Sequence, residues 1–272
     1  MDRRTYLKSG AGAATGLLLA GCVGGTGGSG GETETITIGS DIPYRPFEYE
    51  TESGELTGFD VEIAQAVFEE EMGLDYEFQK TSFDGIIQSL NNGNFRVIMS
   101  AMTITDDRDE QVDFSDPYFT AYQTIVVLND SDIDERSDLK GTSVGVQKGT
   151  TGAGAAEGLK EEFDGDLTLK KFDQINGAFN ALINNQVVAV INDNTVNAEF
   201  VANNDNVRFV EGEGEAAAQG KNAPPYLTLT VEEYGIAFRE DDDDFREEVN
   251  DALAAIRDSG AYEEIYANYF SG

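Results

Sequence analysis

Strand-like and helix-like runs alternate along almost the whole chain, and this alternation limits the folds that the sequence can adopt. Short apolar or alternating runs predict strands at residues 36–39, 76–78, 95–99, 123–128, 142–146, 167–172, 187–191 and 234–238. Amphipathic runs predict helices at residues 58–72, 83–92, 151–163, 175–183, 195–202, 244–258 and 261–270. This pattern is typical of α/β proteins, in which helices cover sheets of largely parallel strands.

A weak internal repeat indicates that the α/β pattern occurs twice. With an offset of 92 residues, Leu90 aligns with Leu182, and the run 95–99 aligns with 187–191. Ser100-Ala101 and Asn192-Asp193 would then follow equivalent strands. Because ligands of open α/β sheets bind at the carboxyl ends of strands, we expect these residues to face each other across a cleft between two lobes.

The charge of the chain restricts its partners and its medium. The sequence has 52 acidic and 18 basic residues, a net charge of −34. Such a protein repels nucleic-acid phosphates and anionic lipid headgroups, so we expect no nucleic-acid partner. Its self-repulsion is largely screened in molar salt, where the Debye length is about 3 Å, which indicates a protein of a halophile.

The residue types that are scarce exclude several kinds of chemistry. His is absent and Cys22 is the single cysteine. Catalytic triads that use His, Cys/His zinc sites and internal disulfides are therefore excluded. We expect neither a metal nor a cofactor.

The first 35 residues have the features of an export signal followed by a flexible tether. Arg3-Arg4 precedes a weakly apolar run at 11–20. This run is shorter than the roughly 20 residues of a membrane span. Together, the arginine pair and the run resemble a twin-arginine export signal. Leu19-Ala20-Gly21-Cys22 resembles a lipobox, in which Cys22 is lipidated and begins the mature chain. We therefore predict a signal peptide at 1–21, a Gly-rich tether at 22–35 and a lipid anchor at the extracellular face of the cell membrane.

Polar residues in turns near predicted strands are candidates for a ligand site. Arg108 lies in a polar turn after a buried strand, where it could clamp a carboxylate; a surface ion pair with Asp106 or Asp109 is the alternative. Asp193 follows a strand and could receive an ammonium group, or could serve as a turn or capping residue.

Other candidates lie at the starts of predicted helices. Gly149-Thr150-Thr151-Gly152 precedes a helix whose free N–H groups attract anions, although such a turn is also an ordinary cap. Phe83 at a helix start, and Tyr44 just past a predicted strand, could enclose a ligand or pack in a core.

Several motifs resemble those of the polar amino-acid-binding proteins of ABC importers, the family 3 extracellular solute-binding proteins. The resemblance covers about residues 36–270. Its motifs are Gly39-Ser40-Asp41-Ile42-Pro43-Tyr44, Gly58-Phe59-Asp60, Phe83-Asp84-Gly85, Thr103-Ile104-Thr105-Asp106-Asp107-Arg108, Asp113-Phe114-Ser115-Asp116-Pro117-Tyr118, Val146-Gln147-Lys148-Gly149-Thr150-Thr151 and Tyr234-Gly235-Ile236-Ala237.

The resemblance implies a two-lobed periplasmic-binding fold of type II, with two Rossmann-like lobes joined by two crossover strands. Lobe 1 would comprise residues 36–122 and 226–272, and lobe 2 residues 123–225. The crossings would lie near 118–124 and between about 210 and 230. Residues 211–225 depart from the family pattern and resemble an insertion.

The resemblance also implies roles for single residues. Arg108 and Thr103 would hold the α-carboxylate of an L-amino acid, helped by the turn with Thr150 and by the Thr151 backbone N–H. Asp193 would take the α-ammonium, with Ser100 or the Ala101 carbonyl beside it. The ligand side chain would be lined by Asp41, Tyr44, Phe83 and Gln147.

The implied function is capture of glutamine, glutamate or a basic amino acid by a monomer that delivers it to the transmembrane subunits of an ABC permease. The alternative is an enzyme resembling cyclohexadienyl dehydratase on the same fold. Such an enzyme would need a buried general acid, for which Asp41 or Glu48 could serve.

Overall fold

The computed structural model describes residues 35–221 and 224–270. The predicted signal peptide, Cys22 and the tether up to residue 34 lie outside these residues. Within the described ranges, no helix is both long and apolar enough to cross a membrane.

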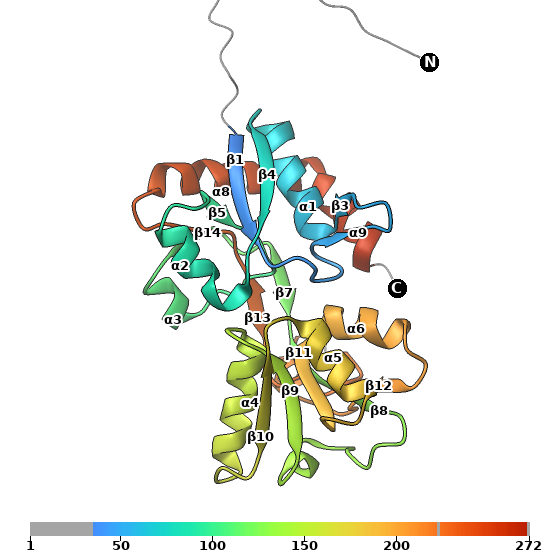
Figure 1. Ribbon diagram of the computed structural model, residues 1–272. Helices are drawn as coiled ribbons and strands as arrows, with labels where there is room; N and C mark the ends of the chain where they lie inside the picture. Colours follow the sequence, from blue (N-terminus) through green and yellow to red (C-terminus); the bar gives the residue numbers. More distant parts are fainter. Residues whose placement is uncertain (1–34, 222–223, 271–272) are drawn as a thin grey trace, which may run out of the picture. The chain divides into compact units, whose positions relative to one another are not determined.

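The first lobe is built on a five-stranded sheet with the order β4-β1-β5-β14-β6 (Figure 1). Strands β4, β1, β5 and β6 run in the same direction, whereas β14 lies between β5 and β6 and is antiparallel to both. Their bounds are β1 (Thr35–Ser40), β4 (Asp75–Lys80), β5 (Val97–Ile98), β6 (Asp113–Phe114) and β14 (Ala237–Phe238). A short hairpin, β2 (Tyr49–Glu50) and β3 (Leu56–Thr57), follows β1.

The helices of the first lobe pack on this sheet and on each other. They are α1 (Phe59–Ala64), which continues as a π-helix (Gln65–Glu71), a 3₁₀ turn (Phe83–Gly85) that leads into α2 (Ile86–Asn91), α3 (Asp106–Asp109), α8 (Asp243–Ser259) and α9 (Ala261–Phe270). The predicted helix at 58–72 is therefore one helical segment that widens to π geometry after Ala64.

The second lobe repeats this arrangement with the sheet order β10-β9-β11-β8-β12. Again four strands run in the same direction, and the fourth strand in the order is antiparallel to both of its neighbours. The strands are β8 (Gln123–Leu128), β9 (Ser143–Gln147), β10 (Thr168–Phe172), β11 (Ala189–Asp193) and β12 (Val207–Phe209), and the helices are a 3₁₀ turn (Arg136–Leu139), α4 (Thr151–Glu162), α5 (Ile175–Ile183), α6 (Asn194–Ala202) and α7 (Glu215–Ala218).

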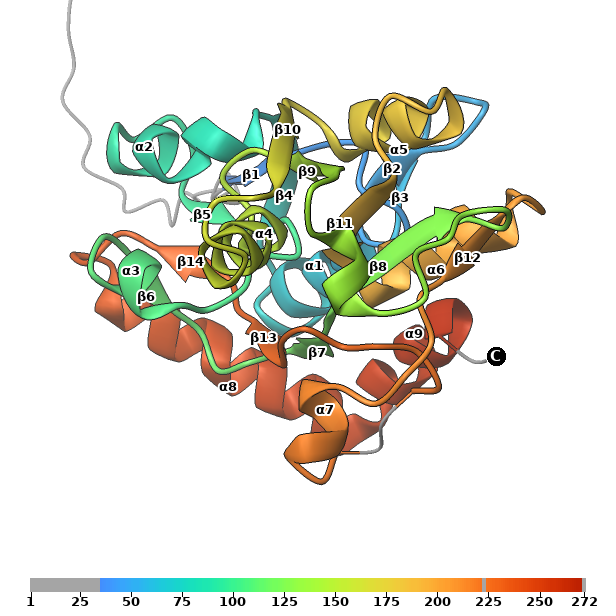
Figure 2. The same ribbon diagram turned by 90° about the horizontal axis from the view of Figure 1, so that it is seen from below.

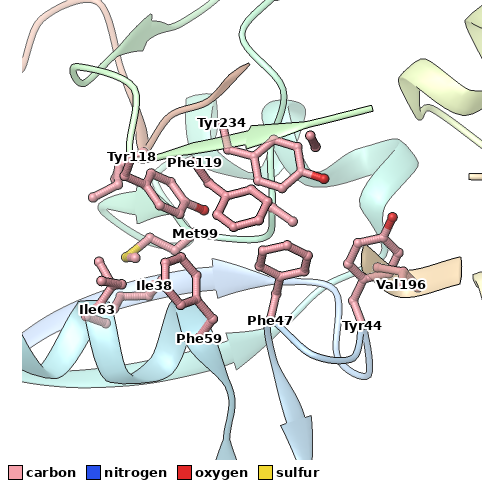
Figure 3. Close-up of a cluster of buried hydrophobic side chains, with 14 of the residues drawn as sticks. Ile38, Tyr44, Phe47, Phe59, Ile63, Met99, Tyr118, Phe119, Val196 and Tyr234 are labelled. Carbon is pink, nitrogen blue, oxygen red and sulfur yellow. The ribbon is translucent and has the colours of Figure 1, made fainter. Parts of the chain in front are cut away.

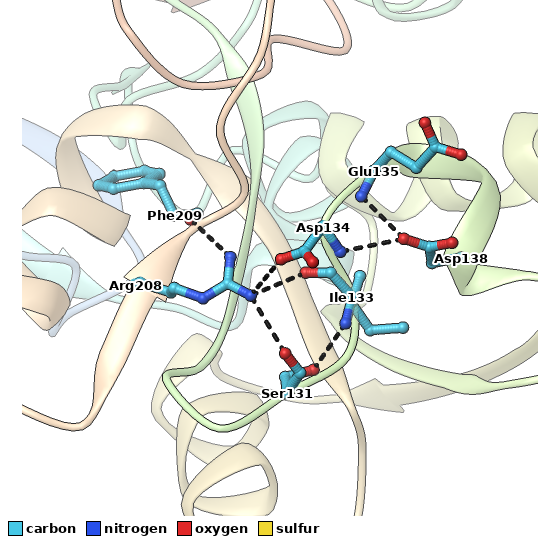
Figure 4. Close-up of polar contacts among 7 residues, drawn as sticks. All are labelled: Ser131, Ile133, Asp134, Glu135, Asp138, Arg208 and Phe209. Carbon is cyan, nitrogen blue, oxygen red and sulfur yellow. Dashed lines mark hydrogen bonds and ion pairs between the residues drawn. The ribbon is translucent and has the colours of Figure 1, made fainter.

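An Arg on the edge strand of this sheet fastens the loop that precedes the 3₁₀ turn. Arg208 Nη2 lies 2.8 Å from Asp134 Oδ1 and donates to the carbonyls of Ser131 and Ile133 at 3.2 and 3.1 Å (Figure 4). Asp138 accepts the backbone N–H groups of Asp134 and Glu135, so the turn is capped by its own side chain.

The two sheets show why the sequence contains an internal repeat. Strand β5 occupies the third place of the first sheet, and β11 occupies the third place of the second. The alignment of 95–99 with 187–191 is therefore an alignment of equivalent strands. The prediction of largely parallel strands is confirmed except for one strand in each sheet, β14 and β8, which enters its sheet from a connection between the lobes.

Two short strands connect the lobes. β7 (Phe119–Ala121) pairs antiparallel with β13 (Glu232–Tyr234), and both strands lie between the sheets (Figures 1 and 2). The predicted first crossing at 118–124 contains β7. The second connection follows the predicted range 210–230, and the predicted strand 234–238 is two strands separated by Gly235-Ile236.

The segment before the second connection still belongs to the second lobe by its hydrogen bonds. Leu227 donates its N–H to Val210 O at 2.9 Å, and Leu229 to Gln123 O at 2.7 Å. The limits 36–122 with 226–272, and 123–225, stay a prediction; these bonds favour moving the second limit to about Thr230.

An aromatic cluster packs the connecting strands against the first lobe (Figure 3). The ring centroids of Phe47 and Phe119 are 5.1 Å apart at an interplanar angle of 85°, and those of Phe47 and Tyr234 are 5.4 Å apart. Such edge-to-face contacts add to the free energy of burial. The ring centroids of Phe270, in α9, and Phe119 are 4.9 Å apart, so the C-terminal helix also packs against β7.

Close packing in the first sheet predicts that the stability of the protein depends on a glycine at position 39. A Cβ atom at Gly39, in β1, would lie 2.3 Å from Cζ of the buried Phe95. We expect Gly39→Ala to lower the free energy of unfolding by about 1–3 kcal/mol in denaturant titrations, because the ring has no free space to enter. Gly154→Ala, at an open position of α4, is the control and should be neutral or slightly stabilising. Equal stability of the two variants would contradict this account of the packing.

Candidate functional site

The structure brings all eleven predicted site residues around one cavity between the lobes. The open space left among them is about 10 Å³, roughly what one water molecule needs. The first lobe contributes Asp41, Tyr44, Phe83, Ser100, Ala101, Thr103 and Arg108, and the second contributes Gln147, Thr150, Thr151 and Asp193.

Arg108 is a buried cation that lacks an acidic partner. Its side chain is held by carbonyls: Nη1 donates to Thr103 O at 2.5 Å and Nη2 to Gly149 O at 3.1 Å. Among the described residues, no carboxylate lies within 4 Å of its guanidinium. The predicted alternative, a surface ion pair with Asp106 or Asp109, is therefore wrong. Burial lowers the pKa of Arg108, and the negative charge of Glu232 opposes this effect.

Asp193 is a buried carboxylate at the end of β11, held by neutral donors. Gln123 Nε2 donates to its Oδ1 at 2.5 Å, and the hydroxyl of Tyr44 contacts its Oδ2. Burial, followed by the charge of Glu232, raises the pKa of Asp193 to about 7. The Tyr44 contact joins the two lobes, since Tyr44 belongs to the first and Asp193 to the second.

Asp41 is a second buried carboxylate without a cation within ion-pair distance in the described chain. Its Oδ2 accepts a hydrogen bond from Gln147 Nε2 at 2.5 Å across the lobes, and Gln174 Nε2 lies 3.5 Å from Oδ1. Burial raises the pKa of Asp41, which the amide donors and the more distant Lys80 counteract. A cationic group that reached Asp41 would replace these neutral partners with an opposite charge.

A buried acidic layer holds the turn that follows β5. Ala101 has a positive φ of 46°, which is uncommon for a residue with a Cβ atom, and its N–H donates to Asp60 Oδ2 at 2.8 Å. Ser100 Oγ donates to Glu48 Oε1 at 2.8 Å and accepts the Asp41 N–H at 2.9 Å. Glu48 therefore positions Ser100 and does not line the cavity itself, so it is not placed to act as the general acid of the alternative reading.

Burial raises the pKa of both carboxyl groups in this layer. The pKa of Asp60 rises to about 6, and that of Glu48 rises well above its ordinary value because the negative charge of Asp60 adds to the effect of burial.

The threonine turn is placed by helix capping and by a close approach of the lobes. Thr150 caps α4, because its Oγ1 accepts the Ala153 N–H at 3.2 Å while it donates to Gln147 O at 2.9 Å. Gly149 has a φ of 74°, and a Cβ there would lie 2.8 Å from Asp84 Cα. The hydroxyl of Thr150 is thus occupied, and Thr151 is the threonine whose hydroxyl faces the connecting strand.

Two polar residues beside the cavity escaped the sequence analysis. Gln123 begins β8, and its Nε2 also lies 3.1 Å from Thr151 Oγ1. Glu232, in β13, accepts hydrogen bonds from the hydroxyls of Thr103 and Thr151 at 2.8 and 2.7 Å. Gln123 could have been noticed as the polar start of an apolar strand, whereas Glu232 carries no local signal that separates it from the adjacent Glu233.

The arrangement suits a ligand that carries both signs of charge. One wall offers the Arg108 guanidinium, and the cavity also contains two carboxylates that are bonded only to neutral donors. Groups of this kind become strong partners for opposite charges once water is excluded.

Comparison with known proteins agrees with this geometry. Residues 36–272 match the bacterial extracellular solute-binding proteins of family 3. The chain belongs to this family. It is 31% identical over 265 residues to the arginine-binding extracellular protein ArtP of Bacillus subtilis, covering 94% of this chain and 97% of that protein. It is 33% identical to a probable histidine-binding protein of Neisseria gonorrhoeae, covering 86% and 82%.

A solved structure confirms the fold class of this family 3 protein. The arginine-, lysine-, histidine-binding protein ArtJ of Geobacillus stearothermophilus superposes with a TM-score of 0.76 at 35% identity, covering 88% of this chain and 96% of that one. The predicted two-lobed periplasmic-binding fold of type II is therefore correct.

The raised pKa of Asp193 predicts how stability depends on pH without ligand. Between about pH 4 and 7, the native state retains a proton on Asp193 that the unfolded chain has lost, so this residue makes unfolding easier as pH rises. Asp193→Asn removes the titration. The stability of the variant relative to the parent should therefore increase from about pH 5 to 7.5, by on the order of 1–2 kcal/mol.

Denaturant titrations at the two pH values would measure this difference. Asp116→Asn, at an exposed position, is the control and should show no such trend. A relative stability of Asp193→Asn that is the same at both pH values would contradict the assignment.

Proposed function

We propose that this protein captures one L-amino acid with a cationic side chain outside the cytoplasm and delivers it to the transmembrane subunits of an ABC permease. The observation that carries the proposal is the buried Arg108 guanidinium, which forms no ion pair with a carboxylate of the described chain. An α-carboxylate would pair with it bidentately. Asp193 would then receive the α-ammonium, with Ser100 or the Ala101 carbonyl beside it.

The charges of the cavity favour a basic amino acid over glutamine or glutamate. After Arg108 and Asp193 have paired with the two α-substituents, Asp41 is left with neutral partners, Gln147 and Gln174. A cationic side chain would compensate Asp41, an amide would only hydrogen-bond to it, and a carboxylate would be repelled. The names of the related proteins, which include arginine and histidine, agree with this choice.

A binding role fits this site better than an enzymatic one. Glu48 is separated from the cavity by Ser100. Asp41 lines the cavity, but a cationic ligand side chain beside it would favour its ionised form, which has no proton to donate. We infer that the chain is a monomeric binding protein without catalytic activity.

The binding proposal is tested by calorimetric titration with L-arginine, L-lysine, L-histidine, L-glutamine and L-glutamate in about 2 M KCl, where surface charges are screened. We expect the tightest binding for a basic amino acid. Arg108→Ala should weaken it about 100-fold or more, because an ion pair desolvated in the closed cleft is lost. Arg136→Ala removes a surface pair with Glu162 and should leave affinity within about twofold.

The variant Asp41→Asn tests the side-chain pocket separately. It should reduce the preference for L-arginine over L-glutamine while it preserves binding of the α-substituents. Absence of binding by any of the common amino acids, in a protein that melts cooperatively, would contradict the proposed function.

We also propose that residues 1–21 are a twin-arginine signal peptide, that Cys22 is lipidated, and that residues 22–35 tether the protein to the outer face of a halophile's membrane. The motifs Arg3-Arg4 and Leu19-Ala20-Gly21-Cys22 support this, as does the net charge of −34. Cys22→Ser should move the protein from the membrane fraction to the medium when it is expressed in a host that exports it. Retention of Cys22→Ser in the membrane fraction would contradict a lipid anchor at this residue.

A further inference from the structure

Glu232 is a buried carboxylate that the proposed ligand contacts do not use. It lies in β13, opposite Ala121 of β7, and its residue is 8% exposed. Its Oε2 accepts hydrogen bonds from Thr103 Oγ1 at 2.8 Å and Thr151 Oγ1 at 2.7 Å, and Gln123 Nε2 lies 3.2 Å from it. Its Oε1 accepts one from Thr230 Oγ1 at 2.8 Å. The carboxylate is therefore fully surrounded by donors.

These donors come from both lobes. Thr103 belongs to the turn after β5 of the first lobe, whereas Thr151 begins α4 and Gln123 begins β8 of the second. The two threonine hydroxyls lie 3.3 Å apart, so they approach each other only while the lobes are together. A charged acceptor strengthens such bonds relative to neutral ones. Glu232, in the connecting strand β13, thus bonds to both walls of the cavity, and the lobes would rotate about this strand.

We propose that Glu232 is a positioning residue that stabilises the closed arrangement of the lobes from the side of the connecting strands. This inference takes one point from the proposed function, namely that closure of the lobes serves ligand binding. The carboxylate holds one hydroxyl of each lobe, and so the closed state is populated even before a ligand contributes its own contacts. The apparent affinity for a ligand then depends on Glu232, since it scales with the closed fraction.

The same bonds determine how the two threonines present themselves to a ligand. A hydroxyl has one proton and two lone pairs, and the protons of Thr103 and Thr151 point to Glu232. Only lone pairs remain for the cavity. The α-carboxylate would therefore be held by Arg108 and backbone N–H groups, while the hydroxyls would act as acceptors.

The test measures the distance between the lobes in the ligand-free protein by electron–electron double resonance. Spin labels at Gln88→Cys on α2 and Gly158→Cys on α4 would report across the cleft, because both positions are exposed and Gly158 has open space around it. Cys22→Ser removes the remaining cysteine from the labelled chain. The matched pair of variants is Glu232→Gln and Glu233→Gln, which make the same change at a buried and an exposed position of one strand.

We expect the ligand-free parent to show a short inter-lobe distance. Glu232→Gln should lower its closed-to-open ratio at least tenfold, because a neutral amide oxygen accepts the bonds at Oε2 more weakly than a carboxylate, and the amide nitrogen no longer accepts the bond from Thr230. Glu233→Gln should match the parent. Distance distributions that are the same in Glu232→Gln and the parent, or a parent that is wholly open without ligand, would overturn the inference.

A second pair of variants keeps the inference testable if Glu232→Gln does not fold. Thr151→Val removes the hydroxyl and should open the lobes, whereas Thr151→Ser retains it and should keep the parental distance. In the double variant with Glu232→Gln, Thr151→Val should add little, since both changes break the same bond. Equal distances in the Val and Ser variants would contradict the role of Glu232. Because the distances are measured without ligand, a failure to bind amino acids would overturn the proposed function and leave this result standing.

Discussion

The burial of charges without opposite charges is the constraint on which this site depends. The guanidinium of Arg108 is bonded to two carbonyls, and the carboxylates of Asp41 and Asp193 are bonded to amides and a phenol. Each of these groups lies in a medium that favours its neutral form. Neutral hydrogen bonds are sufficient to keep the groups inside but do not compensate their charge. These groups can therefore form ion pairs with the charged groups of a zwitterionic ligand.

The rigidity of the first wall comes from residues that the ligand would not touch. Ala101 is held at a positive φ by its bond to Asp60, and Ser100 is oriented by Glu48. Tyr118 donates to Asp60 as well, at 3.0 Å, so the turn after β5 is tied to the residue that precedes β7. The turn that presents Ser100, Ala101 and Thr103 is in this way coupled to the connection between the lobes.

Most of the cavity could be predicted because its residues lie at strand ends and helix starts, where local pattern and family resemblance coincide. The contact between Glu232 and Gln123 could not, because it joins two connections that are 109 residues apart in the chain. The same reason applies to the one antiparallel strand in each sheet. Whether β8 and β14 run parallel to their neighbours depends on where the chain crosses between lobes, and no periodicity in the sequence reports that. The π geometry after Ala64 also leaves the apolar spacing almost unchanged.

Each connecting strand continues almost at once into the fourth strand of a sheet: β7 ends at Ala121 and β8 begins at Gln123, while β13 ends at Tyr234 and β14 begins at Ala237. Any rotation of the lobes is therefore confined to the few residues that link these strands, and its axis runs through them. Parts of a lobe far from this axis move farther than parts near it. Thr103 and Thr151 lie beside the axis through Glu232, whereas the described contacts of Asp41 and Gln147 do not include it. The α-carboxylate and α-ammonium, which all amino acids share, would thus be bound where opening separates the lobes by little more than the displacement that breaks a hydrogen bond. The side chain, which differs between amino acids, would be bound where the same rotation changes the width of the cleft more.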